Sequence, residues 1–119
     1  MITAAPVDTV LRALADPTRR AVFERIASSS EITVSELTRG SGVTQGAVSQ
    51  HLKTLRLAGL VAERPEGRKV HYRADPRGLA PLADWISHYG AFWRERLADL
   101  NALLEEMTDE PDAAPTTHP

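Results

Sequence analysis

The amino-acid sequence predicts a mainly α-helical fold with one small antiparallel β-hairpin. Three observations support this prediction: two helix signatures around a four-residue turn within residues 33–59, two strand-like segments directly after them, and an apolar stripe from residue 82 onward. With 119 residues the chain is long enough for one domain with a modest core, whose stability dimerisation would increase.

Two helices are expected before residue 33, at residues 7–15 and 17–27. Asp16 is a good helix cap and Pro17 suits the first helical position, so the boundary falls between them. The residues expected to be buried in the second helix are Ala21, Val22, Phe23 and Ile26.

Arg19 and Arg20 fall outside the buried stripe of that second helix. Two roles are open to them: a contact with a DNA phosphate, or an ion pair with a nearby acid such as Asp16 or Glu24.

The segment TVSELTRGSGVTQGAVSQHLKTLRLAG, residues 33–59, has the signals of two short helices and a tight turn. Thr33 and Glu36 have the spacing of a capping box, which begins a helix that ends near Arg39. Residues 40–43, GSGV, then form the turn, because glycine tolerates left-handed backbone angles and the valine can anchor the turn on the core. Thr44 caps the next helix.

The helix at residues 44–58 has one apolar and one polar side. Val48, Leu52 and Leu55 cluster at 100° per residue and should be buried, while Gly59 is placed to end the helix. About four turns are enough to cross a major groove of DNA. This is a helix-turn-helix, and residues 44–58 are its expected recognition helix.

The segment that follows predicts a β-hairpin at residues 60–74. Residues 60–64 and 69–73 read as two strands, and residues 65–68, PEGR, join them as a turn. In the second strand, Val70 and Tyr72 fall on one face and His71 and Arg73 on the other. A hairpin with basic residues after a recognition helix is a wing.

Positive charge is concentrated in this part of the chain. Residues 45–77 contain seven Lys and Arg against three Asp and Glu, a balance of 7 − 3 = +4, whereas the whole chain carries −2. Such a distribution favours contact with phosphates.

We expect particular side chains of the second helix and the wing to contact DNA. Those that can read base edges are Gln45, Ser49 and Gln50, with glutamine best suited to adenine. Those that can hold phosphates or enter the minor groove are Thr44, Lys53, Arg56, Arg64, Arg68 and Lys69. Gly46 gives up helix propensity of roughly 1 kcal/mol relative to alanine; it either permits close approach to the duplex or is simply tolerated in the first turn.

The C-terminal part predicts a long helical stretch over residues 79–107, which Asp75 and Pro76 introduce. Its apolar side chains recur over nearly four heptads, more than one small domain needs, and therefore predict dimerisation. The residues expected at the dimer contact are Leu82, Trp85, Tyr89, Phe92, Trp93, Leu97 and Leu100. The alternative is a ligand pocket lined by the aromatic residues. A dimer would place two recognition helices to read an inverted repeat.

Composition excludes several functions. There are no cysteines, hence no disulfides, thiolate metal sites or cysteine nucleophiles, and no phosphate loop or Ser-His-Asp arrangement is visible, so we expect no enzyme and no cofactor. We expect a cytoplasmic protein, because neither a long apolar run nor a secretory signal is present. Residues 108–119, TDEPDAAPTTHP, predict a disordered acidic tail.

Three segments together resemble the arsenic-repressor (ArsR/SmtB) family of winged-helix bacterial transcription repressors. They are LADPTRRAVFERI at 14–26, VSELTRGSGVTQGAVSQHLKTLRLAGLV at 34–61, and EGRKVHYR at 66–73. The resemblance implies a homodimer packed through the first and last helices, residues 7–15 and 79–107. It also implies double-stranded DNA as partner and repression of the protein's own operon, relieved by an effector.

The chain departs from the family at the metal sites. Family members that sense soft metals have a cysteine pair in the helix corresponding to VSELTR, which contains none here. Another branch binds zinc between the last helices, and Asp84 with His88 would supply two ligands one turn apart, with Glu95 and Asp99 of the other subunit as weak partners. The alternative is that Asp84 and His88 form an ordinary surface pair, which leaves no metal site.

Two other functions stay open at this point. One is a zinc-responsive repressor that uses Asp84 and His88. The other is a winged-helix adaptor that binds proteins, since the fold alone does not specify DNA.

Overall fold

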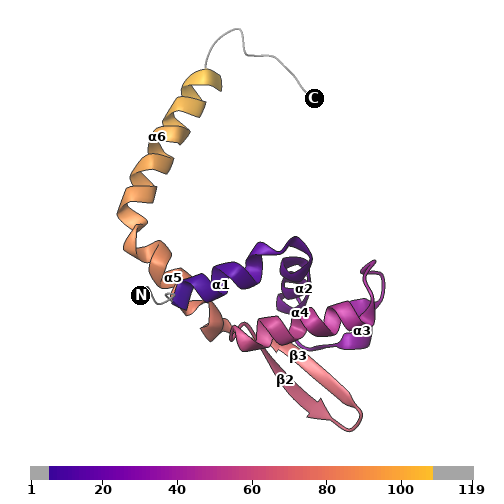
Figure 1. The fold of residues 1–119 in the computed structure, drawn as a ribbon. Coiled ribbons are helices and arrows are strands. Elements are labelled where there is room, and N and C mark those ends of the chain that lie inside the picture. Colours follow the sequence, from indigo (N-terminus) through magenta and orange to yellow (C-terminus); the bar gives the residue numbers. More distant parts are fainter. Residues whose placement is uncertain (1–5, 109–119) are drawn as a thin grey trace. The chain divides into compact units, whose positions relative to one another are not determined.

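The structure, a computed structural model, describes residues 6–108 (Figure 1). The chain divides into two units, the first ending at Asp84 and the second beginning at Trp85. In chain order the elements of the first unit are α1 (Pro6–Ala15), α2 (Pro17–Ala27), β1 (Ile32–Thr33), α3 (Val34–Thr38), α4 (Gln45–Leu57), β2 (Val61–Glu66), β3 (Lys69–Ala74), the 3-10 helix η1 (Pro76–Leu79) and the start of α5 (Ala80–His88). The rest of α5 and α6 (Gly90–Thr108) belong to the second unit.

A core between the helices and the sheet holds the first unit together. Ile26, Leu37, Leu52, Leu55 and Leu60 are each 0–1% exposed, and come from α2, α3, α4 and the start of the hairpin. Burying one such side chain stabilises the fold by about 1.5–3 kcal/mol. The core therefore fixes the helix-turn-helix and the root of the wing as one body.

The buried stripe predicted for α2 is correct except at one residue. Val22, Phe23 and Ile26 are buried, whereas Ala21 is exposed. A helix only 11 residues long that packs along one narrow side buries three side chains, and Ala21 falls outside that side.

The helix-turn-helix has the predicted caps and turn. The Thr33 N–H donates to Glu36 Oε1 at 2.9 Å and the Glu36 N–H donates to Thr33 Oγ1 at 3.3 Å, which completes the capping box. Gly40 and Gly42 have φ angles of 74° and 79°, and Val43 packs against the core. These residues confirm the prediction that the turn depends on left-handed glycines.

The predicted hairpin is part of a three-stranded antiparallel sheet with the strand order β1-β3-β2. The third strand, β1, was not predicted, because two residues are too few to show a period. The predicted turn at residues 65–68 is also wrong: Pro65 and Glu66 belong to β2, and only Gly67 and Arg68 form the loop. Gly67 at the first loop position has φ 61°, as a type II′ turn requires.

Within residues 6–108, Arg19 and Arg20 form no ion pair with Asp16 or Glu24, and their side chains bind backbone carbonyls instead. Arg19 donates through its guanidinium to the carbonyls of Arg12 and Ala13, and Arg20 donates to the carbonyl of Leu14 at 2.8 Å. Carbonyls at a helix C-terminus have no partner within the helix, so these two arginines cap α1. The boundary itself is as predicted, since Asp16 accepts from the Arg19 N–H at 2.8 Å.

The long helix predicted for residues 79–107 is interrupted. Asp75 caps η1, which leads into α5, and α6 starts at Gly90 after a break at Tyr89. Among residues 6–108 no helix is long and apolar enough to cross a membrane. The predicted disordered tail lies almost wholly outside the described residues, and Thr108 is the last residue of α6.

Candidate nucleic-acid interface

The predicted recognition helix, α4, presents its polar side to solvent. Thr44 caps it by accepting from the Ala47 N–H at 3.1 Å, and Val48, Leu52 and Leu55 are 0–1% exposed. With the apolar side fixed in the core, the opposite side chains must face outward. The exposed polar and basic residues of this helix are Gln45, Ser49, Gln50, Lys53, Thr54 and Arg56.

Gly46 lies on this exposed surface, and the protein's own packing does not require a glycine there. A β-carbon added at Gly46 would lie 3.9 Å from the Thr44 hydroxyl oxygen, an ordinary contact distance.

An open groove of about 660 Å³ separates the N-terminal ends of α3 and α4 from the wing. The Arg and Lys residues that line it are Arg39, Arg68 and Lys69; His71 lines it as well, and Glu36 is the acidic residue. Gln45, the predicted base-reading residue, lines the same groove. The structure thus brings the start of the recognition helix and the tip of the wing to one concave, mainly basic surface.

Arg39 was not among the residues predicted to contact DNA. It follows α3 as its C-cap, is exposed, and lines the groove opposite the wing. In the sequence, Arg39 is only a basic residue directly before the turn between the two helices. The structure shows that it lines the same groove as Arg68 and Lys69.

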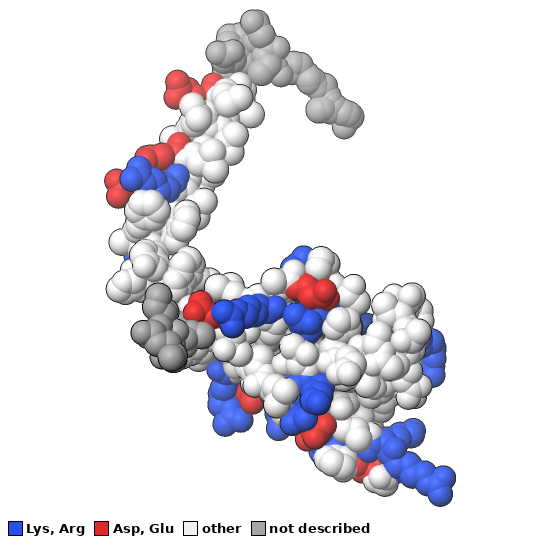
Figure 2. Space-filling view, viewed as in Figure 1, with Lys and Arg blue, Asp and Glu red and all other residues white. Residues whose placement is uncertain are grey.

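The basic side chains at the tip of the wing extend into solvent. Figure 2 shows Lys and Arg side chains extending outward at the wing tip, at the lower right of the view. Arg68 is in the two-residue loop and Lys69 begins β3, and both are exposed. The tight turn thus holds these two charges on a well-defined piece of backbone.

The acidic residues of segment 45–77 are each paired with an arginine. Arg56 lies 3.9 Å from Glu63, Arg64 lies 3.4 Å from Glu66, and Arg77 lies 3.1 Å from Asp75. The cations of this segment that have no ion pair within residues 6–108 are Lys53, Arg68, Lys69 and Arg73. The +4 balance predicted from sequence is thus carried by four specific side chains.

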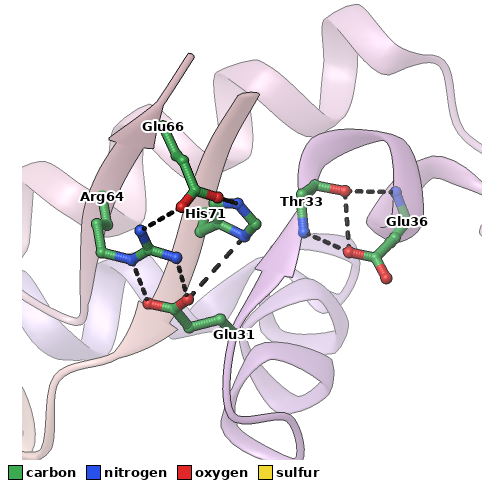
Figure 3. A network of polar contacts seen from close by, with 6 residues as sticks. All are labelled: Glu31, Thr33, Glu36, Arg64, Glu66 and His71. Carbon is green, nitrogen blue, oxygen red and sulfur yellow. Dashed lines mark hydrogen bonds and ion pairs between the residues drawn. The ribbon is translucent and has the colours of Figure 1, made fainter. Parts of the chain in front are cut away.

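Arg64 differs from the other wing cations because it is held by two carboxylates (Figure 3). Its Nη2 and Nε donate to the two oxygens of Glu31 at 2.7 and 3.0 Å, and its Nη1 donates to Glu66 at 3.4 Å. His71 Nε2 lies 3.2 Å from Glu66. The hydrogen bonds from Arg64 lower the pKa of the Glu31 carboxyl and the same bonds raise the pKa of Arg64, so both groups stay charged.

The residues predicted for dimerisation divide into two groups. Leu82 is half-buried and packs against the core of the first unit. The other six are 42–54% exposed, and they are Trp85, Tyr89, Phe92, Trp93, Leu97 and Leu100. Four of them, the aromatic ones, line an apolar pocket of about 360 Å³ within the second unit.

The alternative zinc ligands are not assembled within this chain. Residues 6–108 contain no group of three or more His, Cys, Asp and Glu side chains that could hold a metal ion. Asp84 and His88 also do not form the predicted surface pair in the described part of the chain. His88 instead packs edge-on against Tyr89, with ring centroids 4.8 Å apart.

Known proteins with similar sequences are transcriptional regulators. Residues 14–64 match a family model described as a helix-turn-helix domain. The chain is 41% identical over 110 residues to the HTH-type transcriptional regulator Rv2034 of Mycobacterium tuberculosis, with 92% of this chain and 99% of that protein covered. It is 34% identical over 98 residues to the arsenical resistance operon repressor of Escherichia coli K12, with 82% and 81% covered.

A similar fold is found in a solved structure from a third bacterium. The ArsR-like transcriptional regulator from Rhodococcus sp. RHA1 matches with a TM-score of 0.66 at 30% sequence identity, covering 83% of this chain and 92% of that chain. The similarity extends over the helix-turn-helix and beyond it. The chain therefore belongs to the ArsR/SmtB family of winged helix-turn-helix proteins, and it is a DNA-binding transcriptional regulator, not an enzyme.

Proposed function

We propose that this regulator is a homodimeric repressor that binds an inverted-repeat operator, with α4 in the major groove and the wing on the adjoining backbone. The observation that carries the proposal is the groove shared by α4 and the wing, in which Gln45 lies among Arg39, Arg68 and Lys69. An amide that can pair with a base edge and cations that can hold phosphates are both needed at a DNA interface. The protein would act in the bacterial cytoplasm, where the operator lies.

The proposed division of roles follows from which side chains are exposed. Gln45, Ser49 and Gln50 read base edges, as their outward position on α4 permits. The residues that hold phosphates are Arg39, Thr44, Lys53, Arg56, Arg68 and Lys69. Arg56 is 3.9 Å from Glu63, a loose pair that a phosphate can replace.

The dimer is proposed from the apolar stripe of α6. Trp93, Leu97, Leu100, Leu104 and Met107 follow one another at alternating four- and three-residue steps, and each is 45–59% exposed. Such a stripe on a helix is normally covered, and a second copy covers it symmetrically. A two-fold dimer presents two recognition helices, which accounts for an inverted repeat as the target.

Repression by this chain is proposed by analogy with its relatives, since the arsenical resistance operon repressor carries that role in its name. A cysteine-based metal switch is excluded because the chain has no cysteine. Repression would follow if the operator overlaps a promoter, and the DNA fragment upstream of the protein's own gene is the natural first target.

Gln45→Ala tests the DNA-binding role directly. We expect about a tenfold weaker affinity for the operator fragment and little change for random duplex, because a bidentate amide contact contributes about 1–3 kcal/mol of discrimination. Fluorescence anisotropy with labelled operator and random-duplex competitor measures both affinities. Equal losses on the two duplexes would contradict the base-reading role. If the unaltered protein showed no preference for any upstream fragment, the adaptor function would become the better account.

Leu97→Glu combined with Leu100→Glu tests the dimer. Two carboxylates within the apolar stripe should leave the protein monomeric, because a dimer would bury both negative charges without a partner. Sedimentation velocity measures the mass. The matched control, Ala98→Glu with Ala102→Glu, adds the same charge to the opposite side of α6 and should leave a dimer. A dimer in the leucine variant, or a monomeric unaltered protein, would contradict the proposal.

A further inference from the structure

Glu31 and Arg64 connect parts of the first unit that are far apart in sequence. They are 33 residues apart, and the guanidinium fork of Arg64 engages both oxygens of Glu31. Glu31 directly precedes β1, and Arg64 lies in β2, so the pair spans β3 in the sheet order β1-β3-β2. In β3, His71 is the register partner of both Thr33 and Arg64. The pair therefore joins the two outer strands across the central one (Figure 3).

The link continues into the helix-turn-helix. β1 contains only Ile32 and Thr33, and Thr33 is also the N-cap of α3. Figure 3 shows the Thr33–Glu36 capping box beside the Arg64 cluster. A strand of two residue pairs is weak by itself, so the Glu31–Arg64 pair adds a second attachment between the wing and the start of α3.

The charges around Arg64 are unfavourable for a contact with a phosphate. In the ion pairs that Arg64 forms, Glu31 and Glu66 contribute two negative charges against the one positive charge of Arg64, a balance of 1 − 2 = −1, while Arg73 acts on Glu31 from beyond ion-pair distance. A phosphate that reached Arg64 would meet both carboxylates. Moreover, Arg64 does not line the groove that contains Arg68, Lys69 and Gln45.

We propose that Glu31 and Arg64 are positioning residues for DNA binding, which together fix the wing relative to the helix-turn-helix, and that Arg64 does not itself contact DNA. This inference rests on the proposed function, because the wing must contact DNA for its position to matter. Arg68 and Lys69 then make the wing's contacts, and the Glu31–Arg64 pair holds them at the distance from α4 that a duplex requires.

Two single substitutions separate this role from a direct contact. Glu31→Gln removes a negative charge beside the interface, so an effect of charge alone would strengthen DNA binding. The positioning role predicts the opposite, an affinity about fivefold weaker, because the wing is no longer held in place. Arg64→Lys keeps the charge but loses the fork that engages two carboxylate oxygens. Positioning predicts about fivefold weaker binding for Arg64→Lys as well, with the salt dependence unchanged. The double variant should be no weaker than the weaker single one.

The experiment is fluorescence anisotropy on the operator fragment over a salt series, with the unaltered protein and Arg68→Ala alongside and melting midpoints recorded for each variant. Stronger binding by Glu31→Gln, or near-normal binding by Arg64→Lys, would overturn the inference in favour of a phosphate contact. Lower melting midpoints with unchanged affinity of the folded protein would also overturn it, because the pair would then only stabilise the fold. If Arg68→Ala had no effect on binding, the wing's proposed role would fail first and the positioning role with it.

Discussion

Gly78→Ala is expected to lower the free energy of unfolding by about 3 kcal/mol, at the upper end of the usual cost of overpacking. A β-carbon at residue 78 would lie 2.0 Å from the Gly59 carbonyl oxygen and 2.9 Å from the Leu60 Cα. Both are backbone atoms, so a side-chain rotation cannot relieve the overlap. Urea denaturation followed by circular dichroism measures the loss.

Gly46→Ala is the matched control for this substitution. It adds the same methyl group where the nearest heavy atom is 3.9 Å away and the backbone is helical, so no loss of stability is expected. An equal loss in the two variants, or none at Gly78, would mean that the close approach of η1 to the end of α4 is not required.

The second large effect is expected from removing the unpaired cations of the interface. The triple variant Lys53→Gln, Arg68→Gln and Lys69→Gln should lower the magnitude of the slope of log K against log salt concentration by about 2.7 for each half-site. Each phosphate contact contributes about 0.9 to that slope. At 0.1 M salt the decrease of about 2.7 corresponds to about 500-fold weaker binding for each half-site. Anisotropy titrations over a salt series measure both quantities.

The control for this triple variant removes the same number of charges elsewhere. Its substitutions are Arg12→Gln in α1 and Arg94→Gln with Arg96→Gln in α6. None of these residues lines the groove, so the slope should stay unchanged. A similar decrease of the slope in both triple variants would show that net charge, not these contacts, controls binding.

Features that depend on neighbouring residues could be predicted from the sequence. The capping box of Thr33 and Glu36, the glycines of the turn, and the apolar side of α4 all involve partners within a few positions, and the structure has each of them. The hydrogen bonds and helical period that create these signals act over one or two turns of the chain.

Features that depend on distant partners could not be predicted. β1 exists because Ile32 and Thr33 pair with a strand about 40 residues later, and two residues have no recognisable pattern. From the sequence, Arg64 is expected to be an unpaired cation of the wing, because its partner Glu31 is 33 residues away in the chain. Arg39 likewise gains its place at the interface from the wing folding opposite it.

Pro65 shows how a local rule can mislead. A proline two residues before a glycine favours a turn, yet Pro65 lies in β2 opposite Val70, and the chain turns only after the next residue pair, Glu66 and Lys69. Proline is acceptable there because the strand order leaves β2 with one neighbour. The turn type is set instead by Gly67.

The same strand order also affects the tendency of the protein to aggregate at high concentration. An edge strand can recruit a strand from another molecule and start aggregation. Here Pro65 removes one N–H donor from β2, while Glu63, Arg64 and Glu66 place charges along it. The β2 edge of the wing is thus poorly suited to pairing with a strand of another molecule.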